Sequence, residues 1–227
     1  MSPTSAITKS TNSPRIVAVI GTAGRDASID MTRTLWRLMC EDLSKRINPS
    51  DHLVSGGAAW ADHLAVHAYL NGQCKNLTLF LPAPIANQKY EGPLRSAGST
   101  ANYFHKRFTD AIAENTLEQI SVAIQNGARV SAEPAAPGFA AMFARNRKVA
   151  QLAQAVIAYT FHDGEEPLPG GTLDTWRQIR SSDRTHIDLR PILAQALHLD
   201  MQSKQAAIKA TTKPATKPRF SFTRPTR

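Results

Sequence analysis

The sequence predicts an α/β protein built on a doubly wound parallel sheet with helices on both faces. Short apolar runs rich in β-branched residues recur along the chain, and segments with apolar residues three and four positions apart separate them. Glycine-containing turns follow several of these runs directly. Alternating strands and helices imply right-handed crossovers and a parallel sheet, so a ligand is expected at the carboxyl ends of the strands.

Each predicted strand is a short apolar run that a turn residue stops. The predicted strands cover residues 15–20, 52–54, 76–81, 155–160 and 185–189, and residues 128–132 fit a further short strand. The helices between them are predicted over 32–43 (with Asp30 or Thr32 as the cap), 58–70, 101–126 as one or two helices, 139–154, a stretch opened by 170–176, and 191–199. The loop 82–98 is long for a compact domain, and such loops often cover a ligand.

The composition predicts one domain with two appendages. A chain of 227 residues with 42% hydrophobic residues can bury one sizeable core. We expect a disordered segment over residues 1–14, the folded domain over 15–200 and a basic disordered tail over 201–227. Cys40 and Cys74 are too few for a disulfide framework, and no stretch is apolar enough to cross a membrane. These features favour a cytoplasmic protein with reduced thiols.

The positive charge is concentrated in the predicted tail. The whole chain carries +9, and the tail holds seven basic residues and no acidic ones, so 9 minus 7 leaves +2 for residues 1–200. The seven are Lys204, Lys209, Lys213, Lys217, Arg219, Arg224 and Arg227. Two interpretations stay open, a solvated segment and a segment that contacts nucleic acid.

Three loops rich in small residues are expected at one edge of the sheet. They cover residues 21–26, 55–62 and 170–175, and each follows a predicted strand. Unpaired N–H groups at such strand-to-helix turns favour a phosphate, so the convergence predicts a phosphate and sugar pocket. None of the loops has the spacing of a dinucleotide-binding or P-loop motif. His63 and His67 lack a third ligand at matching spacing, so we predict neither a metal nor a cofactor.

Four motifs in this order resemble the SLOG superfamily, a Rossmann-like group that includes the Lonely Guy phosphoribohydrolases, the DprA DNA-processing proteins and the YpsA-like proteins. The motifs are Val-Ala-Val-Ile-Gly-Thr-Ala-Gly-Arg-Asp at 17–26, Val-Ser-Gly-Gly-Ala-Ala-Trp-Ala-Asp-His at 54–63, Ala-Arg-Asn-Arg-Lys at 144–148 and Gly-Gly-Thr at 170–172. The resemblance covers about residues 15–190 and is strongest to the YpsA-related branch, which has many bacterial and phage members. It implies a nucleotide-type ligand and a homodimer.

The resemblance and the loop chemistry together give the candidate site residues. In the family the first glycine turn and the second glycine turn bind phosphate, Arg147 resembles a catalytic arginine, and Arg145 with Asn146 resembles an Arg-Asn pair of DprA-like relatives. From the loops alone, Arg25 suits a phosphate and Asp26 a ribose hydroxyl, with a loop salt bridge as the other interpretation. The candidate ligand-binding residues are Gly21, Thr22, Arg25, Asp26, Ser55, Gly56, Gly57, Asp62, Arg145, Asn146, Gly170, Gly171 and Thr172.

One departure from the family bears on catalysis. Lonely Guy enzymes follow a Pro-Gly-Gly-x-Gly-Thr turn with a Glu that helps to break the N-glycosidic bond, whereas residues 169–175 are two residues shorter and have Thr175 nearest that position. Asp174 is the carboxylate of this turn, so Arg147 and Asp174 are the candidate catalytic residues, and Asp62 is a further candidate carboxylate. Asp62 and Asp174 are alternatively helix caps, and Arg147 is alternatively an exposed helical cation.

Three functions therefore remain open. The first is binding of a nucleotide or nucleotide-derived ligand, with or without hydrolysis of its N-glycosidic bond. The second is DprA-like binding of nucleic acid that uses the basic tail. The third is a catalytically silent nucleotide sensor or scavenger. Trp60 either stacks on a base or packs against the first loop.

Overall fold

A computed structural model describes residues 14–211. Its centre is a six-stranded sheet in the order β6-β3-β2-β1-β7-β8, and every neighbouring pair is parallel. The strands are β1 (Ile16–Gly21), β2 (His52–Ser55), β3 (Asn76–Leu81), β6 (Arg129–Ala132), β7 (Ala155–Thr160) and β8 (Arg184–Asp188). The strand order reverses between β1 and β7, as in a doubly wound Rossmann-like fold, which confirms the predicted fold class.

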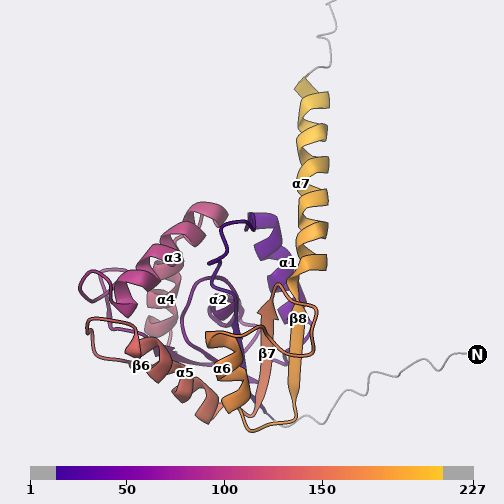
Figure 1. Cartoon of the computed structure of the whole chain (residues 1–227). Coiled ribbons are helices and arrows are strands. Elements are labelled where there is room, and N and C mark those ends of the chain that lie inside the picture. The colour runs from indigo at the N-terminus through magenta and orange to yellow at the C-terminus, as the bar shows by residue number, and fades with distance from the viewer. Residues whose placement is uncertain (1–13, 212–227) are drawn as a thin grey trace, which may run out of the picture.

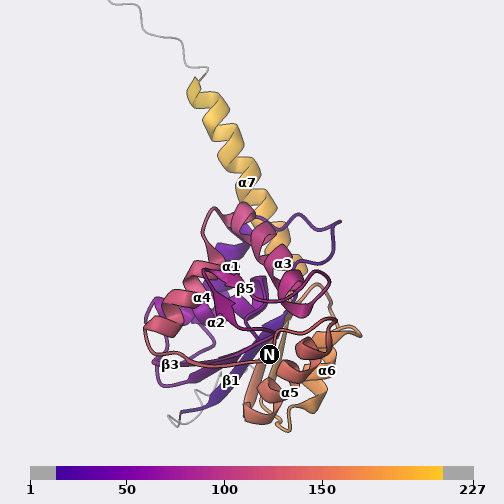
Figure 2. The same cartoon turned by 90° about the vertical axis from the view of Figure 1, so that its left-hand side faces the viewer.

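Helices cover both faces of this sheet (Figures 1 and 2). They are α1 (Arg33–Ser44), the short 3-10 helix η1 (Trp60–Asp62), α2 (His63–Leu70), α3 (Ala97–Ile112), α4 (Thr116–Gln125), α5 (Ala140–Leu152), α6 (Gly171–Gln178) and α7 (Leu189–Thr211). Successive side chains of β1 point to opposite faces, so Val17 and Val19 join one core and Ala18 and Ile20 join the other. The larger core contains residues of α1 to α4 and α7, and the smaller core contains residues of α5 and α6.

The start of α1 shows how the sequence sets a helix boundary. Thr32, not Asp30, is the N-cap, and its Oγ1 accepts a hydrogen bond from the backbone N–H of Leu35 at 3.1 Å. Leu35, Met39 and Leu43 lie on the same side of the helix and are buried against the sheet.

Two helices occupy the segment 101–126, and the hairpin before them was not predicted. Ala113 has a left-handed backbone and ends α3, and Asn115 caps α4. The segment 82–98 contains a hairpin of β4 (Ile85–Ala86) and β5 (Lys89–Tyr90). Positive φ angles at its two turn residues, Asn87 and Gln88, match the tight turns that suit two-residue hairpins. Tyr103 of α3 is 58% exposed and lies outside the core.

The last helix is longer than the sequence analysis predicted. We expected it to end near Leu199, but α7 continues to Thr211 because residues 192–211 contain neither glycine nor proline. Its first half packs against α1, where Thr34 hydrogen-bonds to Asp200, and its second half projects from the body (Figures 1 and 2). Residues 201–211 of the predicted tail are therefore helical, and residues 1–13 and 212–227 lie outside the described residues. Within 14–211, every helix is too short or too polar to cross a membrane.

Candidate functional site

The three loops of small residues meet at the carboxyl ends of β1, β2 and β7. Gly21 ends β1 with a φ of +153°, and a Cβ there would lie 2.1 Å from the backbone oxygen of Tyr159 on β7. The N–H of Thr22 donates to that oxygen at 2.9 Å, and the carbonyl of Thr22 accepts from the N–H of Ala61 at 3.1 Å. Thr172 Oγ1 donates to the carbonyl of Gly21 at 3.0 Å. These contacts join the first loop to both glycine turns.

A buried ion pair lies directly on the first glycine turn. Arg145, on α5, donates from Nη1 to Asp62 Oδ2 at 2.8 Å, and the two side chains are 13% and 6% exposed. The guanidinium fills the space next to Gly56, where a Cβ would lie 1.1 Å from Nη1. Arg145 Nε is buried and has no hydrogen-bond partner within residues 14–211. A buried cation with an unused donor therefore lies against the turn that the sequence predicts for phosphate.

Hydrogen bonds from two other elements fix the shape of the same turn. The carbonyl of Gly57, whose φ is +64°, accepts from Tyr90 Oη at 2.7 Å and from His105 Nε2 at 3.0 Å. Because a carbonyl only accepts, His105 carries its proton on Nε2, and Nδ1 accepts from Thr116 Oγ1 at 2.9 Å. Burial lowers the pKa of His105 to about 4, so the ring is neutral at pH 7. Sequence reasoning missed Tyr90 and His105, which carry no local signal for this role.

Ser55 stabilises the inner side of the turn. Its buried hydroxyl donates to the backbone carbonyl of Asp62 at 2.7 Å and accepts from the N–H of Gly57 at 3.2 Å. The N–H of Ala58 lies 3.5 Å from Asp62 Oδ2. The turn and the start of the following helix are thus held as one rigid unit.

The second glycine turn opens α6 beside α5. Gly170 is its N-cap with a φ of +151°, and Asn146 Nδ2 donates to the carbonyl of Gly171 at 3.4 Å. Asp174 lies in the first turn of α6, is exposed, and accepts from Gln178 Nε2 at 2.9 Å. Asp174 is not the cap of α6, because Gly170 occupies that position and no side chain caps the helix, but a carboxylate in the first turn interacts favourably with the helix dipole.

Three candidate residues lie farther out. Arg147 is exposed and makes no hydrogen bond or ion pair with the rest of the described chain, whereas its neighbour Lys148 pairs with Glu133 at 2.7 Å. Asp26 accepts from the N–H and the hydroxyl of Ser28 at 2.9 Å and 2.6 Å, and these bonds lower the pKa of its carboxyl group. Arg25 is not paired with Asp26; its guanidinium carbon lies 5.5 Å from the ring centroid of Phe104.

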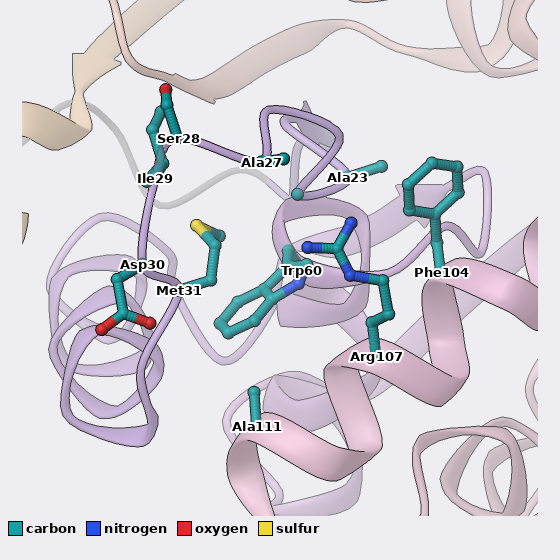
Figure 3. Close-up of a pocket in the computed structure, with 11 residues that line it drawn as sticks. Ala23, Ala27, Ser28, Ile29, Asp30, Met31, Trp60, Phe104, Arg107 and Ala111 are labelled. Carbon is teal, nitrogen blue, oxygen red and sulfur yellow. The ribbon is translucent and has the colours of Figure 1, made fainter.

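A cavity of about 390 Å³ adjoins the first loop (Figure 3). Its walls come from residues 23–24 and 27–31, from Trp60 and from α3, and we call it the Trp60 cavity. The α3 residues in its wall are Phe104, Arg107 and Ala111. Trp60 is 3% exposed, and its indole lies so close to Gly24 that a Cβ there would be 2.7 Å from Nε1. This confirms that Trp60 packs against the first loop.

Together these features define a Rossmann-like α/β protein with three small-residue loops and a buried arginine at the carboxyl edge of its sheet. A scan against protein-family models found no match. The chain is 35% identical over 184 residues to the uncharacterized protein R261 of Acanthamoeba polyphaga mimivirus, in an alignment that covers 76% of this chain and 95% of the viral protein. It belongs to the same family as that viral protein.

Among solved structures, the chain is similar to DNA processing protein A from Helicobacter pylori, which was described for its single-stranded DNA binding mode. The sequence identity is 16% and the TM-score is 0.40, with 82% of this chain and 81% of that chain covered.

Proposed function

We propose that this chain is a SLOG-type protein that binds a nucleotide or nucleotide-derived ligand, with the ligand phosphate held at Gly56 and Gly57 and by Arg145. The observation that carries the proposal is the Arg145 guanidinium, which is largely buried, lies against a glycine turn and makes no hydrogen bond from Nε within residues 14–211. Guanidinium groups bind phosphate through two parallel hydrogen bonds, and a site that excludes water strengthens them. The N-terminus of α6 adds backbone N–H donors beside Asn146.

We further propose that the site binds its ligand without breaking the N-glycosidic bond. Hydrolysis needs a carboxylate that positions a water molecule at the reacting carbon. Asp174 is exposed and engaged with Gln178, and Asp62 is engaged with Arg145. Neither arrangement supports a free carboxylate for that task. Release of free base from nucleoside monophosphates, followed by chromatography, tests this directly, and turnover that Asp174→Asn abolishes would contradict it.

The test of binding compares two arginines of α5 that lie two residues apart. Nucleoside monophosphates, cyclic nucleotides, ADP-ribose and NAD are titrated against the full chain by calorimetry and thermal shift. A ligand at 100 times its Kd adds roughly 2.7 kcal/mol of stability. Arg145→Gln is expected to weaken the best ligand at least tenfold, Arg145→Lys to weaken it less because the charge is kept, and the exposed Arg147→Gln to change it little.

Two outcomes would count against this function. Failure of every ligand to bind the wild-type chain would remove the proposal. If Arg147→Gln loses ligand binding and Arg145→Gln does not, then Arg147 and not Arg145 binds the phosphate. Arg147 is the arginine that the resemblance to the SLOG superfamily implies. The unliganded melting temperature of each variant separates loss of binding from loss of folding.

A second candidate function is binding of single-stranded nucleic acid, and a cluster of aromatic and arginine side chains favours it. Arg25 contacts Phe104, and its Nη2 lies 3.9 Å from Met142 Sδ. Tyr103 stacks edge-to-face on Phe104, with Arg107 5.9 Å from its ring. Tyr103 is exposed and Phe104 is half-buried, and arginines lie against both rings. Such a surface suits the stacking of a base and contact with the nucleic-acid backbone.

Removing the exposed Tyr103 ring should weaken the binding of single-stranded nucleic acid. Tyr103→Ala is expected to weaken binding of labelled oligothymidylate about 5- to 150-fold, because one base–aromatic stack contributes about 1–3 kcal/mol. Fluorescence anisotropy measures this, with Leu94→Ala as the control because Leu94 is a highly exposed apolar side chain outside the cluster. Truncation after Thr211 tests whether the basic residues within 212–227 contribute to oligonucleotide affinity. Equal oligonucleotide affinity in Tyr103→Ala and the wild type would remove the cluster from this role.

A further inference from the structure

We propose that the Trp60 cavity is the base subsite of the ligand, and that it makes the protein select nucleotides over bare sugar phosphates. This inference rests on the proposed function, because the phosphate is taken to lie at Gly56 and Gly57. The cavity shares no lining residue with the Arg145 and Asp62 pair. It therefore adds a second, chemically different part to the site.

The walls of the cavity suit a flat aromatic group. Phe104 provides a half-buried aromatic surface, the almost fully buried Trp60 indole closes the inner end, and Met31 with Ala111 provides aliphatic walls (Figure 3). Nucleobases stack on aromatic rings, and a polarisable methionine packs well beside them. At about 390 Å³, the cavity falls in the size range of small-molecule sites.

The polar groups of the cavity fit the edge of a base. The Arg107 guanidinium projects between Trp60 and Phe104 in Figure 3, and it forms no ion pair or hydrogen bond with the other described residues. A guanidinium offers paired donors to acceptor atoms on a base edge, such as a carbonyl oxygen and a ring nitrogen. Arg107 is therefore expected to orient the base as well as to bind it.

Chain connectivity places the two parts of the site within reach of one ligand. Trp60 is three residues after Gly57, so their Cα atoms are at most about 11 Å apart. The loop that carries Gly24 is fixed to both parts, because Thr22 bonds to Ala61 and Gly24 packs on the indole. A mononucleotide can span this separation with its phosphate at one end and its base at the other.

The test uses pairs of neighbouring residues on α3. Phe104→Ala and Arg107→Gln change the cavity, and Lys106→Gln and Asp110→Asn change exposed side chains of the same helix that do not line it. Affinities for nucleoside 5′-monophosphates and for ribose 5-phosphate are measured by calorimetry on the full chain. We expect the cavity variants to lose about 5- to 150-fold for monophosphates and nothing for ribose 5-phosphate, and the controls to lose nothing for either.

Three outcomes are informative. Wild-type binding of ribose 5-phosphate as tightly as of monophosphates, or unchanged monophosphate affinity in both cavity variants, would overturn the base subsite and leave the proposed function standing. Absence of binding of any nucleotide to the wild type would overturn both. If Phe104→Ala does not fold, Arg107→Gln decides alone, because Arg107 is exposed. Quenching of tryptophan fluorescence by monophosphates, without quenching by ribose 5-phosphate, is the expected second readout.

Discussion

Asp62→Ala should lower the free energy of unfolding by about 3–5 kcal/mol and abolish binding at the glycine turn. The substitution leaves the Arg145 guanidinium buried without its carboxylate, and an uncompensated buried charge is far more costly than a lost surface pair. Binding is expected to be lost because Asp62 no longer fixes the guanidinium next to Gly56. Urea unfolding gives the stability change through the shift in midpoint at constant slope.

A double substitution separates the charge effect from a simple loss of packing. Asp62→Ala combined with Arg145→Met removes both charges, so the double variant should be more stable than Asp62→Ala alone. Asp62→Asn, which keeps an acceptor for Arg145 Nη1, should lie between the wild type and Asp62→Ala. A cost below about 1 kcal/mol for Asp62→Ala would show that the pair behaves as a solvent-screened surface pair.

Lowering the pH from 7 to 4.5 should lower the free energy of unfolding by roughly 3–5 kcal/mol. Burial lowers the pKa of His63 to about 3 and of His105 to about 4, from an ordinary value of 6.5. Below pH 6.5 the unfolded chain binds protons at both histidines while the folded chain does not. Stability is therefore complete above pH 6.5 and falls by about 1.4 kcal/mol per pH unit for each histidine toward its folded pKa.

A substitution tests whether protonation of the buried histidines causes this loss of stability at low pH. His105→Gln keeps a donor near the carbonyl of Gly57 and removes one titrating ring, so its stability should depend less steeply on pH between 6.5 and 4.5. His186→Gln is the control, because His186 lies on the edge strand β8, three strands from β2, is less buried and bonds to Thr160 and Gly164. Equal slopes in the wild type and His105→Gln would assign the acid effect to other groups.

The strands and the site edge could be predicted because they depend on local sequence. The runs that form β3 and β7 are mostly apolar, since both faces of the sheet are buried. Loop convergence then follows from the parallel topology alone. The end of α7 could not be predicted, because no glycine or proline between residues 192 and 211 marks where the helix stops. The polar composition of its second half is also typical of a disordered tail.

Pairings between distant segments could not be predicted from one sequence. Arg145 and Asp62 were each candidate site residues, yet 83 positions separate them and nothing local indicates that they form a buried pair. The Trp60 cavity likewise combines a loop, η1 and one side of α3, and nothing local marks Phe104 as a cavity residue. The hydrogen bonds that Tyr90 and His105 donate to the carbonyl of Gly57 also join segments that are far apart in the sequence. Such contacts become visible only when the elements are placed in space.

The overlap between Arg145 and the open side of Gly56 makes the glycine a steric requirement of the ion pair. A Cβ at position 56 would lie 1.1 Å from Arg145 Nη1 and 2.8 Å from Asp62 Oδ2, so Gly56→Ala would have to displace both partners. A short side chain at position 145 would remove only the first of these overlaps. The missing side chain of Gly56 therefore forms the recess in which the two charges meet.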